Sequence, residues 1–513
     1  MPDHTYHAYH PYHPYHARLS SSPPTQRISA LSTYPRRGIL ARLIAGIASI
    51  AAAGLAGCAT VDVTVPDSIA APAAFSEAPA EGTPAAAQDL AQWWRNWNDP
   101  ELTQRVTEAL AANLDLRVAQ ARVAEARAIG QVAESALYPT LSAQARAARG
   151  VADLRSPPGL PDTSPGLDGH LAGLTVAWEV DVFGGRRSDA QAAAAVALSA
   201  EARLRGTRLV IAADVAGNYL AARGLQRRLQ QLDRSTEIVG QLLSYTRARY
   251  AAGQALSYDV DRVSEQLGAL QAQRPVLTSQ ISMRERRLAV LAGQVPQAAA
   301  TLSPPPALFV PAPPAGQVPS DVIERRPDVR AMAALVRAQA ARLGSAKAER
   351  FPRFYLTFLG QDGHLHVDGL PALSGTGGLV GVGVQLPIFT AGRIQAGIDA
   401  GDARLQAAQA EYNQAVLRTL EEVDNAYSQR SSLDQRGARL ADVVATAQRN
   451  SQNATRLYEG GRRTLQDVLD ARVGALQRED ELIQTQTAQA LAAVQLYRAL
   501  GGEWPGDPES ARH

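Results

Sequence analysis

The 513-residue sequence predicts a mainly α-helical fold with a smaller β component, in which one structural unit occurs twice in tandem. A motif near residue 250 returns 208 positions later with its internal spacing kept, so both copies must build the same unit. Within each copy, short segments with apolar residues at every second position precede long proline-free stretches. These two patterns are typical of strands and of long helices, respectively.

The amino-terminal segment has the pattern of a secretory signal. Three arginines precede the apolar run Leu43–Leu55, which ends in Leu55-Ala-Gly-Cys58. This ending resembles a bacterial lipobox, so we expect Cys58, the single cysteine, to carry a diacylglycerol and an N-acyl chain. The alternative is a free thiol beside an uncleaved helix, which the short apolar run disfavours. Ala59 follows where an aspartate would favour retention at the inner membrane, so we expect delivery to the outer membrane.

The first 16 residues hold five histidines interleaved with tyrosine and proline. Such a tract can bind metal, but its place before the segment to be removed favours a disordered extension or a start codon assigned too early. Without residues 1–57 the chain has 46 basic and 48 acidic residues. This balance gives no support for nucleic-acid binding.

The repeat sets the expected domain boundaries. Its clearest motif reads Tyr250-Ala-Ala-Gly253 in the first copy and Tyr458-Glu-Gly-Gly461 in the second. We expect an extension with signal peptide, a lipidated tether, repeat 1, a Pro-rich connector, repeat 2 and a tail (1–57, 58–92, 93–300, 301–320, 321–502 and 503–513).

Folding is expected to begin at the tryptophan-rich segment 93–97. Asp99 can cap a helix that starts at Pro100, where proline's missing N–H would be unpaired in any case. The following helix carries a narrow seam of mostly small apolar residues and stops before Pro139; its counterpart in the second copy stops before Pro352.

After each of these prolines the apolar period changes to two, which predicts a pair of strands in each copy. The apolar positions of the four strands run over 141–147, 174–182, 354–358 and 380–388. The Gly/Pro/Asp-rich stretches Val151–His170 and Gln361–Gly378 predict solvent-exposed hairpin loops. The alternation fits an outer-membrane barrel and fits a half-buried soluble sheet equally well.

Long helices follow the strands. Arg186–Ala252 and Arg393–Glu459 contain no proline, and each could run to roughly 100 Å at 1.5 Å per residue. Gly253 and Gly461 suit the left-handed caps at which the chain reverses into a second helix. These return helices are expected to end near Gly293 and Gly501, the first with a kink at Pro275.

Four strands in one chain are too few to close a membrane barrel, and open sheet edges are not tolerated inside a bilayer. Closure must therefore come from other subunits. Two chains would make eight strands with a filled interior, whereas three make twelve and leave a lumen. We expect a homotrimer with a twelve-stranded membrane barrel at one end and a hollow tube of long helices extending into the periplasm.

At this point the motifs support a family resemblance, over about residues 55–502. The chain resembles the TolC-type outer membrane factors, and within them the NodT-like lipoprotein branch that serves multidrug efflux. The motifs are Leu-Ala-Gly-Cys58, Trp93-Trp94 with Asp99-Pro-Glu-Leu102, Phe183-Gly-Gly-Arg186, Arg325-Arg-Pro-Asp-Val329, Phe389-Thr-Ala-Gly-Arg393 and Tyr458 to Ala471.

The resemblance implies a passive exit duct in the outer membrane of a Gram-negative bacterium. It implies docking onto a periplasmic adaptor (membrane fusion) protein and an inner-membrane transporter that is powered elsewhere. It implies no catalytic activity, no metal and no cofactor beyond the lipid on Cys58. The cargo is not readable from the chain, because specificity would reside in the transporter.

The resemblance also places the helix reversals at a periplasmic tip that is closed at rest. Tyr458 and Arg463 match family positions that tie neighbouring helices shut, with Asp259 as the matching partner in the first copy. Asp467 and Asp470 lie three apart on one helix face, so three chains would supply six carboxylates around the axis. The alternative is that Asp467 merely caps a helix start, which leaves Asp470 unexplained.

The two copies differ at this tip. Arg463 corresponds to Ala255 and Asp470 to Arg262, so the charges cannot be sixfold symmetric. The turns themselves, expected to contact the adaptor, contain Gly253 and Leu256 in the first copy and Gly461 and Thr464 in the second. Leu256 replaces the small hydroxyl residue of the second copy, which leaves the shape of the first turn open.

Three other functions compete with the exit duct. An enzyme is disfavoured because no phosphate-binding Gly-rich loop, nucleophile elbow or metalloprotease helix occurs, and His364 with His366 makes a poor metal site alone. A lipid-tethered coiled-coil protein would explain the helices but not the strand pairs. The outer duct of a type I protein-secretion system would be similar, but such ducts more often lack the acylated cysteine.

Overall fold

The computed structural model of the chain describes residues 63–64, 69–78, 90–151, 158, 164–305 and 308–502. All of them belong to the second of two compact units, which starts at Ala59. The expected signal peptide, the lipidated Cys58, most of the tether and the tail from 503 lie outside the described residues.

The two copies have the same order of elements: a short helix, a medium helix, two strands, a long helix and a return helix. Repeat 1 contains η2 (Trp93–Trp97), α2 (Pro100–Ala112), α3 (Leu114–Ser135), β1 (Thr140–Val151), β2 (Gly166–Val180), α4 (Gly185–Ala251) and α5 (Ser257–Leu291), with η3 (Pro296–Ala298) following. Repeat 2 contains α6 (Pro319–Arg325), α7 (Pro327–Ala348), β3 (Arg353–Val367), β4 (Leu373–Gln385), α8 (Arg393–Glu459) and α9 (Leu465–Ala499).

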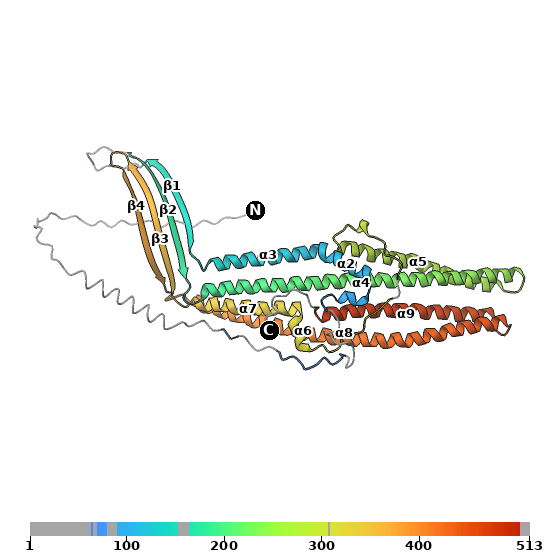
Figure 1. Cartoon of the computed structure of the whole chain (residues 1–513). Coiled ribbons are helices and arrows are strands. Elements are labelled where there is room, and N and C mark those ends of the chain that lie inside the picture. Colours follow the sequence, from blue (N-terminus) through green and yellow to red (C-terminus); the bar gives the residue numbers. More distant parts are fainter. Residues whose placement is uncertain are drawn as a thin grey trace, which may run out of the picture. The chain divides into compact units, whose positions relative to one another are not determined.

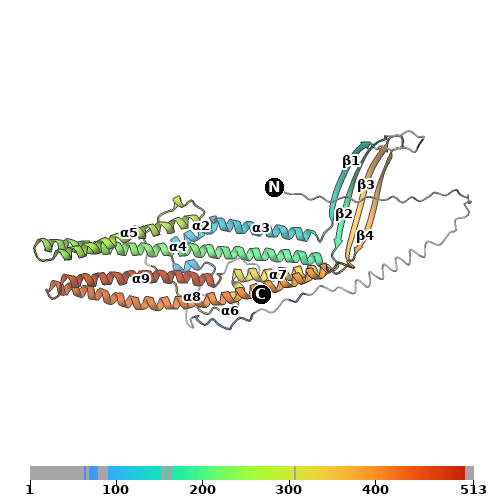
Figure 2. The same cartoon turned by 180° about the vertical axis from the view of Figure 1, so that it is seen from behind.

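The long helices α4 and α8 have 67 residues each, so each is roughly 100 Å long. Helix α4 packs against α3, α5, α7 and α9, and α8 packs against α7 and α9. The strands adjoin one end of α4 and α8, and the turns into α5 and α9 lie at the other end (Figures 1 and 2). Helix α5 continues through Pro275 as one element.

The predicted helix starts and seams are confirmed. Asp99 Oδ1 accepts hydrogen bonds from the N–H groups of Glu101 (3.0 Å) and Leu102 (3.1 Å), which fixes the start of α2 at Pro100. Leu116 and Val123 of the α3 seam are buried, as are Val329 and Leu343 of the α7 seam.

The four strands form one antiparallel sheet in the order β1-β2-β3-β4, with β2 and β3 joining the two repeats. The pairing runs without a bulge from Thr140 opposite Ala177 to Leu365 opposite Leu373. Among the described residues, β1 and β4 each pair on one side only. The sheet is therefore open at both edges.

The predicted hairpin loops were too long. Residues 166–170 and 361–367 lie in β2 and β3, whose glycines are held by ladders on both sides, and residues 373–378 lie in β4, paired with β3. The predicted strand over 380–388 instead ends at Gln385, since Pro387 has no N–H for the ladder. The strand predicted to reach Val182 ends at Val180.

The main core lies where α2, the middle of α4 and the end of α9 meet. Trp93 is fully buried and stacks on Tyr497, with ring centroids 5.5 Å apart, and Trp97 packs edge-on against Trp93. No helix among the described residues is both long and apolar enough to cross a membrane.

Candidate functional site: the helix turns at the tip

The two turns at the end of the long helices have the same backbone. Gly253 and Gly461 adopt φ values of +70° and +69°, a left-handed conformation that favours glycine. In both turns the glycine N–H bonds the carbonyl oxygen three residues earlier, at 2.9 Å, and the next N–H reaches the carbonyl five residues earlier, at 2.8 Å. The predicted C-caps at these two glycines are confirmed.

The caps of the return helices differ. In α9, Thr464 and Asp467 form a full capping box: the Asp467 N–H donates to Thr464 Oγ1 (3.2 Å), and Asp467 Oδ2 accepts from the Thr464 N–H (2.9 Å) and hydroxyl (2.8 Å). In α5, Asp259 Oδ2 accepts only from the Leu256 N–H (3.0 Å), because a leucine side chain has no acceptor. The first turn therefore has only one of the two hydrogen bonds of a capping box, the one accepted by the Asp259 carboxylate.

Arg463 also acts locally. Its Nη1 lies 3.4 Å from Asp467 Oδ1, one helical turn away, and both side chains are partly exposed. The hydrogen bonds from Thr464, with a smaller contribution from Arg463, hold the pKa of Asp467 below its usual value. The capping role proposed for Asp467 is therefore present in the structure.

Asp470 connects the two repeats. Its Oδ1 lies 3.5 Å from Arg262 Nη2 of α5, and both of its carboxylate oxygens accept from Gln466 Nε2 at 2.7 Å. Arg262 and Asp470 occupy equivalent positions in the two copies, so residues that correspond by sequence meet as an ion pair. The pair is exposed, at 47% and 63% of the side-chain surface, and is therefore weak in water.

Tyr458 makes a second connection between repeats. Its hydroxyl forms a hydrogen bond with the hydroxyl of Tyr245 from α4, and the two rings meet edge to face with centroids 6.3 Å apart. This hydrogen bond, more than the slight burial, raises the pKa of the Tyr458 phenol. Tyr458 thus ties α8 to α4.

A small apolar cluster lies in the same region, between the two helical hairpins, which are the pairs α4–α5 and α8–α9. It contains Val239 and Leu243 of α4, Val263 of α5 and Leu469 of α9, all at least 92% buried. Two exposed polar connections and one buried apolar contact thus join the helix pairs α4–α5 and α8–α9 near the turns.

The structure thus brings together some of the predicted site residues and separates others. Tyr458 and Asp470 join the hairpins, whereas Arg463, Asp467 and Asp259 act within their own turns. The partners Tyr245 and Arg262 were missed as contacts. Arg262 had been noticed only as the counterpart of Asp470, and nothing in the sequence singles out Tyr245.

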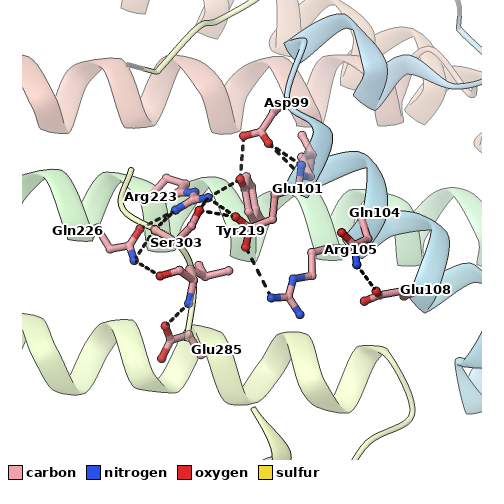
Figure 3. A network of polar contacts seen from close by, with 12 residues as sticks. Asp99, Glu101, Gln104, Arg105, Glu108, Tyr219, Arg223, Gln226, Glu285 and Ser303 are labelled. Atoms are coloured by element: carbon pink, nitrogen blue, oxygen red, sulfur yellow. Dashed lines mark hydrogen bonds and ion pairs between the residues drawn. The ribbon is translucent and has the colours of Figure 1, made fainter. Parts of the chain in front are cut away.

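A second polar network, also missed, lies in the main core (Figure 3). Arg223 of α4 is 3% exposed, and its Nη2 donates to Glu101 Oε2 (2.7 Å) and the Tyr219 hydroxyl (2.8 Å). The Tyr219 hydroxyl donates in turn to Asp99 Oδ2 (2.7 Å), and burial raises its pKa. Ser303 of the connector also bonds Glu101, so the network fastens α2 and the connector to α4. Both terminal nitrogens of Arg223 are paired within the protein, and only its buried Nε lacks a partner among the described residues, so we assign the network a structural role.

The part of the chain that the structure describes contains no group of three or more His, Cys, Asp or Glu side chains that could hold a metal ion. His170 and His364 stack as a cross-strand pair with ring centroids 5.5 Å apart.

Comparison with known families and structures gives consistent results. Residues 106–294 and 318–502 match the family model described as outer membrane efflux protein. The pyoverdine export outer membrane protein OpmQ of Pseudomonas aeruginosa is 29% identical over 430 residues, which are 82% of this chain and 89% of that protein. The solvent efflux pump outer membrane protein SrpC of Pseudomonas putida is 28% identical over 414 residues, 80% and 86% of the two chains.

Solved structures also resemble this chain. The outer-membrane channel OprN superposes with a TM-score of 0.76 at 29% identity, covering 87% of this chain and all of OprN. The outer membrane protein VceC from Vibrio cholerae superposes with a TM-score of 0.71 at 24% identity, covering 81% and 99% of the two chains. The VceC likeness supports the fold alone.

Proposed function

The chain belongs to the outer membrane efflux protein family, and from this premise we propose that it is the passive exit duct of a multipart pump that expels small molecules. The observation that carries the proposal is the placement of two features at opposite ends of 67-residue helices. One end has a four-stranded sheet with open edges, and the other has two turns held by breakable contacts. The names of the relatives support efflux rather than protein secretion.

The duct is completed by two further copies of the chain. A lone sheet edge in a bilayer leaves backbone groups unsatisfied, and three copies supply the twelve strands that enclose a lumen. Helix α3 supports this arrangement, because an apolar stripe on it is exposed: Leu114, Val118, Ile129 and Val132, at 50% to 71% of their surface.

The internal repeat suggests what covers that stripe. Within the chain, α4 of the first copy packs against α7 of the second. The equivalent pair in the other order would be α8 of the second copy with α3 of the first. These two helices do not pack against each other within the chain, because α4 and α7 lie between them. We therefore assign α8 of a neighbouring chain as the partner of α3.

The tip is the proposed gate and the contact site for a periplasmic adaptor, which would link the duct to an inner-membrane transporter. Tyr458 and Asp470 hold the two hairpins of each chain together, while Arg463, Asp467 and Asp259 shape the turns. The turn residues Gly253, Leu256, Gly461 and Thr464 form the outermost surface available to the adaptor. Three copies would surround the opening with the carboxylates of Asp467 and Asp470.

Acylation of Cys58 is proposed as an additional anchor in the outer membrane, supported by its sequence context alone. Labelling with a radioactive fatty acid tests it, with Cys58→Ser as the control that should lose the label. Equal labelling of the variant would contradict the proposal.

Conductance through purified protein in planar bilayers tests the duct and its gate together. Replacing Tyr458 by Phe and Asp470 by Ala removes both polar connections between the hairpins, so conductance should rise several-fold. Tyr250→Phe is the matched control, because Tyr250 is the repeat counterpart of Tyr458 and is 51% exposed. Arg463→Ala with Asp467→Ala should have a smaller effect, since their contact is local.

Two results would count against these proposals. Channels that conduct equally with and without the two contacts would remove Tyr458 and Asp470 from the gate. A monodisperse monomer in the absence of detergent would exclude the barrel altogether.

A further inference from the structure

One face of the sheet carries an apolar concavity of about 460 Å³ near the end distant from the helices. Leucines and glycines of the central strands and of β4 make up most of its lining, with one arginine from β1. These residues are Leu167, Leu171, Leu365 and Leu373, with Gly169, Gly363, Gly375 and Arg146; Ala148, His170, His364 and Ser374 complete the lining.

The concavity follows from a reciprocal pairing of leucine with glycine. Leu171 of β2 lies opposite Gly363 of β3, and a Cβ atom added to that glycine would be 3.1 Å from Leu171 Cδ1. Two rungs away the order is reversed: Gly169 lies opposite Leu365, whose Cδ1 would be 3.3 Å from an added Cβ. Each of these two leucines therefore lies over a glycine, and the backbone of the glycines forms the bottom of the concavity.

The strand register decides which face this is. The ladders have no bulge, so alternate residues stay on one side along the whole sheet. The opposite face carries Val380, Val382 and Val384, each more than 60% exposed, as expected for contact with lipid. The face with the concavity also holds Thr357 and Gln361. In the proposed barrel the concavity therefore faces the lumen.

The chemistry of the concavity selects its ligand. Leu167, Leu365 and Leu373 expose 38%, 42% and 68% of their surface, so an apolar molecule seated there would remove leucine surface from water. Arg146 lies directly opposite Leu171. No hydrogen bond or ion pair to its guanidinium occurs among the described residues, and no carboxylate lines the concavity.

We propose that this leucine–glycine concavity binds amphiphilic anions on the inner wall of the duct near its outer mouth. The ligand has an alkyl or small-ring body that covers the leucines and one carboxylate, sulfate or sulfonate that pairs with Arg146. The volume is within the range of small-molecule sites. This inference rests on the proposed function, which supplies the lumen that the ligand passes through.

Block of single-channel current by 1-octanesulfonate tests the inference in planar bilayers. The wild-type channel should be blocked by 1-octanesulfonate at concentrations where ethanesulfonate, which lacks the tail, and octyltrimethylammonium, which has the opposite charge, have no effect. Arg146→Gln should raise the half-blocking concentration about tenfold, as expected for the loss of one charge-assisted hydrogen bond. Leu373→Ser should raise it about fivefold through lost apolar contact.

Leu379→Ser is the matched control, because Leu379 is on the same face of β4 and is 64% exposed but does not line the concavity. It should leave the block unchanged. Equal block of wild type, Arg146→Gln and Leu373→Ser would overturn the inference, as would equal block by the cationic probe. Arg146 and Leu373 are both exposed, so we expect the two variants to fold. Normal current without blocker checks that their duct is intact. Absence of any channel in wild type would instead refute the proposed function.

Discussion

The two turns at the tip are copies of one backbone with different side chains. Gly253 and Gly461 give them the same left-handed cap and the same hydrogen bonds. Their side chains differ where the hairpins meet: the second turn has a full capping box and an acid at 470, and the first has half a box and a base at 262. The duplication therefore preserved the shape and made the charges complementary.

This difference has a consequence for the proposed gate. Two identical copies would place like charges at positions 262 and 470, and the hairpins would repel each other there. With Arg262 facing Asp470, the two copies attract. Divergence between the repeats thus provides a contact that a symmetric tube cannot have.

The largest expected effect comes from reversing that charge. Asp470→Arg would place two guanidiniums within a few ångströms of each other at the exposed tip, where water and salt reduce their repulsion but do not abolish it. We expect conductance in planar bilayers to rise several-fold over wild type, and the rise to shrink at high ionic strength.

The control is the exchange of the pair. Arg262→Asp combined with Asp470→Arg restores opposite charges, so conductance should return towards the wild-type value. If the double variant conducts as much as Asp470→Arg alone, the charge pair does not hold the tip closed.

Much of the comparison between the turns was predictable from the sequence. The spacing of Gly253 and Gly461 located both reversals, and the Thr464 to Asp467 spacing indicated the cap, because these features depend on residues within a few positions of each other. The contacts between hairpins were not predictable. Tyr245 and Tyr458 are 213 residues apart, and their meeting depends on how four long helices pack.

The same limit applies elsewhere in the chain. Alternation located all four strands, but the glycines and histidines of 361–367 resemble loop residues until the pairing on both sides of β3 is known. In the sequence, Arg223 is one of many arginines in the long proline-free stretch 186–252. Its burial follows from α2 and the connector lying over α4, which no local pattern indicates.

The next largest effect is a loss of hydrogen-exchange protection on replacing the turn glycines, and it should be equal in both turns. Gly253→Ala and Gly461→Ala each place a Cβ in a left-handed residue with open space around it, so backbone strain of about 1–2 kcal/mol is the only cost. Hydrogen exchange of peptides spanning each turn, followed by mass spectrometry, should show the same loss of protection in both. Unequal losses would mean that the turns differ in backbone as well as in side chains.

Substitution of the N-cap residues should change the stability of the two turns by a smaller amount and in opposite directions. Thr464→Ala removes the acceptor for the Asp467 N–H and should destabilise the second turn by about 1 kcal/mol. Leu256→Thr supplies the missing hydroxyl in the first turn and should increase its protection by a similar amount. The cap difference is refuted if Leu256→Thr leaves hydrogen exchange in the first turn unchanged.

The smallest effect is a dependence on acid in the second turn. The Asp467 carboxylate accepts two hydrogen bonds from Thr464, which lowers its pKa in the folded state. A lowered pKa stabilises the fold at pH values above the unfolded value of about 3.9, and this stability is lost as the pH falls through the folded value. Protection of the second turn should therefore fall below pH 4. Asp467→Asn keeps an oxygen acceptor but cannot titrate, so its protection, compared with wild type at each pH, should lack this acid-dependent fall; an identical fall in the variant would assign it to another group.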